Sequence, residues 1–190
     1  MKKFTRIEPT TVYTAGDKYK RALVVKRFGT DDGKVHEFTT MLREGSRAGG
    51  AIAITKDGQV VTMHQFRAGP ERWMYDIPGG GINEGEDPEV GVIRELREET
   101  GYRPGKITLL GTTCRDAYFN CTWYYYLATD CELHSQGRDL DEEEHDQGAE
   151  VQLISIDELI DHAKNDRMTD PAAVLMAYDK LKEIQHGTSN

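Results

Sequence analysis

The sequence predicts an α+β fold in which helices pack on a mixed β-sheet. Strand-like runs rich in β-branched and aromatic residues occur at 20–28, 34–44 and 51–66 and return at 106–114 and 122–130, whereas helical signals occur at 88–100 and after residue 155. Strands, one helix, more strands and then helices are typical of an α+β domain rather than of regular βα repeats. With 190 residues, 37% of them hydrophobic, the chain suits one domain with a sizeable core.

Two hairpins are predicted in the first half of the chain. Residues 20–28 are rich in Val and other strand formers, and the glycine- and aspartate-rich segment GTDDG at 29–33 indicates a turn before residues 34–44. Residues 51–66 repeat this arrangement around Asp57-Gly58. We therefore expect an antiparallel strand pair over 20–44, followed by a second pair.

A helix over about 88–100 has clear boundaries. Asp87 is a good N-cap, Pro88 suits the first helical position, and Gly101 ends the helix. We expect an apolar face that packs on the sheet, formed by Val92, Ile93 and Leu96 and flanked by Val90.

The second half ends in two further helices. KITLLGTTC and TWYYYLATD predict two strands, and residues 151–155 predict a short third one. Ser155 and Glu158 have the spacing of a capping box, so a helix should begin there. The last helix should begin after Pro171.

Charge and cysteine content narrow the function classes. A net charge of −9 and a pI near 5.2 argue against a general nucleic-acid binder, which needs a basic face. The three cysteines lack Cys-x-x-Cys spacing, which favours a reducing compartment, and Cys114 and Cys121 are expected to be packed thiols. We find no signal peptide and no transmembrane stretch, so we expect a cytoplasmic protein without membrane partners.

A glycine-rich loop and an acidic helix form the most informative segment, MYDIPGGGINEGEDPEVGVIRELREETGY at 74–102. Glu95, Glu98 and Glu99 have i, i+3 and i+4 spacing, so their like charges cost about 0.2–0.5 kcal/mol per close pair unless they are neutralised. Arg94 offsets part of this cost, and a hard divalent cation would offset more. A solvated charged helix face is the simpler alternative, but it does not account for the glycines at 79–81.

The same segment resembles the signature of the Nudix hydrolases. Gly80 is followed after five residues by Glu86 and after seven more by Arg94-Glu95-Leu96-Arg97-Glu98-Glu99-Thr100-Gly101-Tyr102, which matches every defined position. The resemblance implies a Nudix-type mixed β-sheet sandwiched by helices. It also implies that a metal-activated water attacks one phosphorus of a pyrophosphate in a nucleoside diphosphate derivative, with Mg²⁺ or Mn²⁺ as cofactor.

Site residues carried over from the resemblance have four roles. Arg94 would orient the glutamates, and the metal ligands would be the Gly79 carbonyl, Glu95, Glu98 and Glu99. The loop residue Gly80, the outer glutamate Glu86 and the helix-ending Gly101 would support the site. Glu144, in the acidic loop before the last strand, is the candidate base, although a solvated acidic loop explains residues 142–144 equally well.

Segments outside the signature are similar to the ADP-ribose pyrophosphatase and nucleotide-sugar hydrolase group. The similarity implies one Nudix domain over 1–190, with a core at 46–190 and an antiparallel strand extension at 1–45 that forms a homodimer. Arg67 would bind phosphate, Arg43 would bind substrate, and Phe28 or Trp73 would stack on a base. Core packing is the alternative for both aromatic residues, and it is favoured for Trp73.

Two positions carry residues that differ from those usual in this group, so the identity of the substrate stays open. Asp76 stands where the group has a glutamate, and Asp116 lies where ADP-ribose hydrolases have a proline. ADP-ribose or a related nucleotide sugar is the expected substrate, and a housecleaning hydrolase of nucleoside triphosphates is the alternative. A non-catalytic Nudix ligand sensor is the alternative from another class, disfavoured because every signature glutamate is present.

Overall fold

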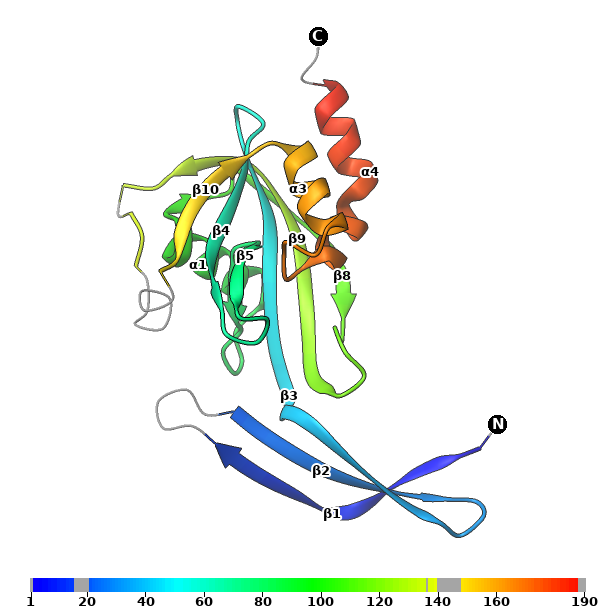
Figure 1. Cartoon of the computed structure of the whole chain (residues 1–190). Helices are drawn as coiled ribbons and strands as arrows, with labels where there is room; N and C mark the ends of the chain where they lie inside the picture. The colour runs from blue at the N-terminus through cyan, green and yellow to red at the C-terminus, as the bar shows by residue number, and fades with distance from the viewer. Residues whose placement is uncertain (1, 16–20, 136, 140–147, 188–190) are drawn as a thin grey trace. The chain divides into compact units, whose positions relative to one another are not determined.

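The structure is a computed structural model that describes residues 2–15, 21–135, 137–139 and 148–187 (Figure 1). It divides into two compact units. Unit 1 comprises Met1–Ser46 and Thr113–Thr122, and unit 2 comprises Arg47–Thr112 and Trp123–Asn190. Strands β3 (Val35–Thr55) and β9 (Phe119–Leu133) each contribute residues to both units.

Unit 1 is built on an antiparallel sheet of β1 (Phe4–Ala15), β2 (Arg21–Thr30) and the first part of β3. The predicted turn is confirmed, because the Gly33 N–H donates to the Thr30 carbonyl at 2.9 Å. Strand β1 was not predicted from its own residue pattern. A break was predicted at residues 45–50, but β3 continues through them past Gly45, which adopts a φ of 79° that suits glycine.

Unit 2 contains the remaining strands. After a turn at Gly58, β3 pairs with β4 (Val60–Arg67), which also pairs with β5 (Arg72–Asp76) and β10 (Glu150–Ile154). The short strand β6 (Gly79–Gly81) pairs with β3. On its other side β3 pairs with β9, which also pairs with β7 (Tyr102–Arg103) and β8 (Lys106–Thr113).

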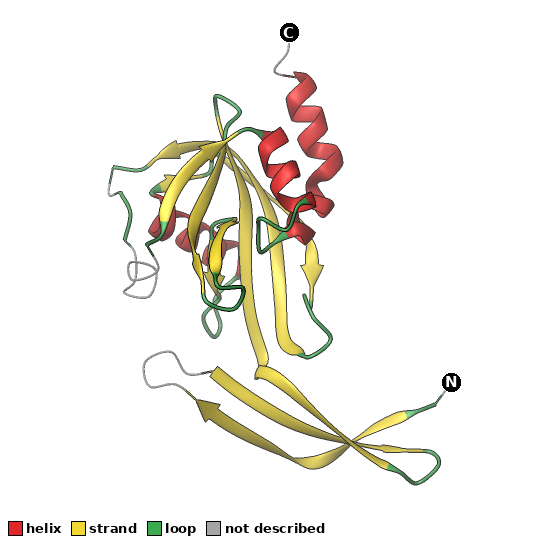
Figure 2. Ribbon diagram, viewed as in Figure 1, coloured by secondary structure: helices red, strands yellow, loops and turns green. Residues whose placement is uncertain are grey.

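Helices cover both faces of the unit 2 sheet (Figure 2). Because side chains alternate along a strand, Ala51 and Ala53 of β3 pack with Val92 and Leu96 of α1 (Pro88–Thr100). The intervening Ile52 and Ile54 belong to a second buried cluster, formed with α3 (Ile156–Lys164) and α4 (Pro171–Gly187). The expected α+β fold, with a mixed sheet sandwiched by helices, is confirmed.

The predicted helix ends are also confirmed. The Asp87 carboxylate accepts the Glu89 backbone N–H at 2.9 Å, and Gly101 ends α1 in the left-handed conformation. Ser155 and Glu158 form the capping box of α3. None of the helices in the described ranges combines the length and hydropathy that a bilayer crossing requires.

Some expectations about burial were wrong. Val90 is 58% exposed. It precedes Val92 by two residues, so it points about 200° away from Val92 around the helix axis. Trp73 on β5 is 52% exposed instead of packed in the core. All three cysteines are free, with Cys121 and Cys131 buried, but Cys114 is exposed because it follows the last residue of β8.

Candidate active site

The glycine loop lies against β3 with almost no space between the two backbones. Gly79 and Gly80 pair with Gly50 and Gly49. A Cβ atom on Gly79 would lie 2.2 Å from the Gly49 carbonyl oxygen, a contact that side chains do not tolerate. A Cβ on Gly80 would lie 2.6 Å from Oε2 of Glu95, so the absence of a side chain there leaves room for that carboxylate.

Helix α1 presents its glutamates at different depths. Val92 and Leu96 are fully buried, and Glu99, which follows Leu96 by three residues, is only 6% exposed. Glu95 and Glu98 are partly exposed at the edge of this face. Glu95 and Glu98 therefore lie beside the buried face of the helix, whereas Glu99 belongs to it.

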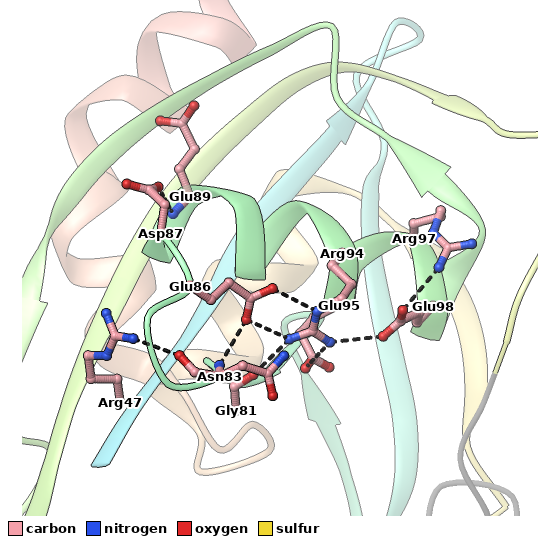
Figure 3. Close-up of polar contacts among 10 residues, drawn as sticks. All are labelled: Arg47, Gly81, Asn83, Glu86, Asp87, Glu89, Arg94, Glu95, Arg97 and Glu98. Atoms are coloured by element: carbon pink, nitrogen blue, oxygen red, sulfur yellow. Dashed lines mark hydrogen bonds and ion pairs between the residues drawn. The ribbon is translucent and has the colours of Figure 1, made fainter. Parts of the chain in front are cut away.

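The Arg94 guanidinium gathers the acidic side chains (Figure 3). One terminal nitrogen donates to Glu95 at 2.7 Å and to Glu98 at 2.9 Å. Nε and the other terminal nitrogen donate to Glu86 at 3.0 and 3.2 Å, and the latter also donates to the Gly81 carbonyl at 3.0 Å. Arg94 thus joins the loop, the outer glutamate and two helix glutamates, as expected for a residue that orients them.

Glu86 is held in its charged form by two donors. The hydrogen bond from Arg94, which is the larger cause, and the bond from the Asn83 backbone N–H, at 2.8 Å, together lower the pKa of Glu86 from 4.5 to about 2. In return, the hydrogen bond to Glu86 is the largest of the interactions that raise the pKa of Arg94. The two groups therefore hold each other in their charged forms.

The Glu99 carboxylate contacts the glycine loop directly. Its Oε2 accepts the Gly79 backbone N–H at 2.7 Å, so these two predicted metal ligands are neighbours. The end of the helix is also anchored, because Arg138 donates to the Glu99 carbonyl at 2.7 Å and the Asp139 N–H donates to the Glu98 carbonyl at 2.7 Å. These bonds satisfy carbonyls that a helix end leaves without intrahelical partners.

The donor set suits a hard divalent cation, because carboxylate and carbonyl oxygens are the ligands that Mg²⁺ and Mn²⁺ prefer. In the described ranges, however, no group of three or more Asp, Glu, His and Cys side chains converges as metal ligands would. Both oxygens of Glu98 accept hydrogen bonds from arginines, Oε2 from Arg94 and Oε1 from Arg97. A cation at Glu98 would share this carboxylate with a guanidinium or replace one.

The other predicted site residues lie outside the signature segment of the sequence. Arg67 lies at the end of β4 in unit 2 and is bonded to Asp76. Phe28 lies in unit 1 and makes edge contacts with Phe4 and Phe38, with ring centroids 6.4 and 5.8 Å away. Arg43 is an exposed residue of unit 1, and Glu144 lies outside the described residues.

A buried polar group beside the signature was missed. Asp76, which is 3% exposed, accepts hydrogen bonds from Gln65, Arg67 and Thr169. In the sequence, Asp76 was notable only because the related group has a glutamate at this position. The alternation of Gln65 and Arg67 indicated a shared strand face, but nothing in the sequence indicated that Thr169, 93 residues from Asp76, contacts it.

Gly79→Ala should distort the loop, whereas Gly81→Ala should not. The new Cβ at position 79 would meet backbone, so we expect a loss of about 1–3 kcal/mol in the free energy of unfolding. A Cβ on Gly81 has no atom within 4 Å, so a change within about 0.5 kcal/mol is expected. Urea unfolding followed by circular dichroism measures both, and equal effects would contradict the proposed reason for Gly79.

Glu86 should stabilise the fold above about pH 4.5 and lose that effect toward pH 2. Its pKa is lower in the folded chain than the ordinary 4.5, so the folded state holds the carboxylate better and the stabilisation disappears as the pH falls to about 2. Melting temperatures of wild type and Glu86→Gln in EDTA should differ by a constant amount above about pH 4.5 and converge below it. A difference that persists unchanged to pH 2 would contradict the assignment.

Comparison with known proteins identifies the family. The family model of the NUDIX domain matches residues 46–176. An ADP-ribose pyrophosphatase of Bacillus subtilis (strain 168) is 31% identical over 134 residues, which are 70% of this chain and 71% of that protein. The methanol dehydrogenase activator of Bacillus methanolicus is 30% identical over 164 residues, which are 84% and 87% of the two chains.

A solved structure shares the fold. The crystal structure of an ADP compounds hydrolase matches 95% of each chain with a TM-score of 0.71 at 19% identity. The domain match, the two relatives and the arrangement of the signature residues agree with one another. The chain therefore belongs to the NUDIX family.

Proposed function

We propose that this Nudix hydrolase cleaves the pyrophosphate bond of ADP-ribose or a closely related ADP-linked compound. The reaction class follows from the family. The observation that carries the proposal is the Arg94-centred arrangement of Glu86, Glu95 and Glu98 beside the Gly79–Gly81 loop. The substrate rests on the Bacillus subtilis relative, an ADP-ribose pyrophosphatase similar to most of this chain.

The chain's own residues would position the cofactor and the diphosphate. Glu95, Glu98, Glu99 and the Gly79 carbonyl would hold Mg²⁺ or Mn²⁺, with Arg94 setting the directions of two of these carboxylates. When bound, such an ion supplies Lewis-acid chemistry that activates water and offsets phosphate charge. Water adds at one phosphorus and the P–O–P bond breaks, so ADP-ribose would give AMP and a ribose phosphate. Glu144 remains the candidate base.

Arg67 is proposed to contact the diphosphate. Its side chain is 36% exposed, and it supplies positive charge in a chain with a net charge of −9. Phe28 and Arg43 remain proposed substrate contacts, made by unit 1. A cytoplasmic location is also part of the proposal, supported by the three free cysteines.

Glu98→Gln tests the catalytic proposal. Because the variant removes a charge from the proposed ligand set while it keeps the side-chain shape, turnover of ADP-ribose should fall by at least about 100-fold, the upper end of what the loss of an outer-shell partner costs. Formation of AMP, measured chromatographically with Mg²⁺ or Mn²⁺, is the readout, and EDTA should abolish it.

Glu89→Gln is the matched control, since Glu89 is an exposed glutamate of the first turn of the same helix. It should hydrolyse ADP-ribose like the wild type. Nucleoside triphosphates are assayed in parallel, and a clear preference for them would favour the housecleaning alternative. Binding of ADP-ribose without turnover in the presence of metal would favour the sensor.

We also infer that unit 1 forms a homodimer interface. Both hydrophobic core clusters found in the described residues belong to unit 2. Tyr13, Leu23 and Met41 lie directly opposite one another across β1, β2 and β3 and are 60%, 42% and 42% exposed. A small sheet that exposes such an apolar row is marginal alone, and a second copy would cover it.

Leu23→Lys tests this inference. Light scattering should give the wild type twice the chain mass of 21.5 kDa and should give Leu23→Lys the single chain mass, because the lysine would be desolvated at the interface. The control Leu175→Lys changes an exposed leucine of α4 in unit 2 and should leave the mass doubled. A monomeric wild type would contradict the dimer.

A further inference from the structure

Asp76 is the centre of a buried hydrogen-bond group that the signature does not include. Its Oδ2 accepts Nε2 of Gln65 at 3.0 Å, and it also accepts Nε and a terminal nitrogen of Arg67 at 2.9 and 2.8 Å. Its Oδ1 accepts the Thr169 hydroxyl. Both oxygens of the carboxylate are therefore engaged by donors from this chain, and Asp76 is suited to hold a partner rather than a cation.

Strand register places this group on the side of the sheet that α1 covers. The register of β4 is unbroken from Val60 to Arg67, so Arg67 shares a face with Val61, which packs in the cluster that contains Val92 and Leu96 of α1. Met63 lies opposite Asp76, so the aspartate belongs to the same face. Asp76 also precedes Gly79 by three residues, which ties the group to the glycine loop.

The segment 167–170 is hydrogen-bonded to the strand that carries Asp76. The Tyr75 N–H donates to the Arg167 carbonyl at 2.9 Å, and the Thr169 N–H donates to the Tyr75 carbonyl at 3.1 Å. The next residue, Asp170, is buried and accepts the hydroxyl of the buried Tyr125 at 2.9 Å. The carboxylate of Asp76 is thus fixed relative to the core, and whatever it holds is fixed as well.

The Arg67–Asp76 pair is buried at one end and open at the other. The Asp76 side chain is 3% exposed, whereas that of Arg67 is 36% exposed. An arginine held by a buried carboxylate loses little conformational entropy when it meets a further anion, because its planar guanidinium is already oriented. Arginine also matches phosphate oxygens in a bidentate manner.

We propose that Asp76 is a positioning residue that holds the Arg67 guanidinium in the orientation in which it binds the substrate diphosphate. The proposal rests on the proposed function and deepens it, since it identifies what sets the direction of the phosphate-binding arginine. The C-terminal segment 167–170 becomes part of the substrate site, because Thr169 fixes Asp76. The shorter aspartate, where the related group has glutamate, suits this direct contact with Thr169.

The test is a double-mutant cycle on binding in EDTA, where hydrolysis does not interfere. Calorimetry gives the Kd of ADP-ribose for the wild type, Asp76→Asn, Arg67→Ala and the double variant. Asp76→Asn should weaken binding by about 10-fold, as the loss of a residue that orients a ligand group does. The double variant should bind no more weakly than Arg67→Ala alone, because Asp76 acts through Arg67.

Further variants separate positioning from folding. Asp166→Asn is the matched control, since it weakens another Asp–Arg ion pair, Asp166–Arg72 at 2.5 Å, between β5 and the residue that precedes segment 167–170, and it should bind like the wild type. Asp76→Glu should restore part of the affinity. Thr169→Val keeps both charges and should weaken binding in the same direction, which provides the test if Asp76→Asn does not fold.

Two results would overturn the proposal. Asp76→Asn could bind ADP-ribose as tightly as the wild type, or the losses in the two single variants could simply add in the double variant. Inorganic diphosphate serves as a second probe on the same variants. A wild type that binds diphosphate but neither binds nor hydrolyses ADP-ribose would contradict the proposed substrate, and the diphosphate series would still decide the role of Asp76.

Discussion

The guanidinium of Arg94 is the group on which the candidate active site depends. It bonds two glutamates of α1, the outer glutamate Glu86 and the carbonyl of Gly81, so one side chain connects helix, loop and turn. Without this charge, the carboxylates would repel one another across one helix face. Arg94 thus allows the chain to concentrate acids before a cation is bound, and it presents them beside the loop.

Burial divides the signature glutamates into different roles. Glu95 and Glu98 are partly exposed and interact with arginines, whereas Glu99 is buried and accepts the backbone N–H of Gly79. The apolar residues Val92 and Leu96 fix the rotation of α1 on the sheet, and that rotation determines which glutamate faces inward. The packing of the core and the placement of the acids are therefore one structural constraint.

Sequence patterns predicted most of the fold and singled out the segment from Gly79 to Gly101 as the candidate site, because both depend on local order. The capping residues of α1 and α3, the turns at Gly33 and Gly58 and the spacing from Gly80 to Gly101 are all local. Features that depend on tertiary contacts were not predictable. Trp73 is a large aromatic residue of the kind expected in a core, but its own position on β5 is 52% exposed, and the contact between Thr169 and Asp76 joins distant segments.

Binding of Mn²⁺ to the chain without substrate tests the central claim, that the α1 carboxylates form a metal site, most directly. Electron paramagnetic resonance measures free Mn²⁺ as it is added to the wild type, Glu99→Gln and Glu89→Gln. The account predicts saturable binding by the wild type and Glu89→Gln, and at least about 10-fold weaker binding by Glu99→Gln, which lacks a proposed ligand. Equal affinity in all three proteins would contradict it and would place the cation elsewhere.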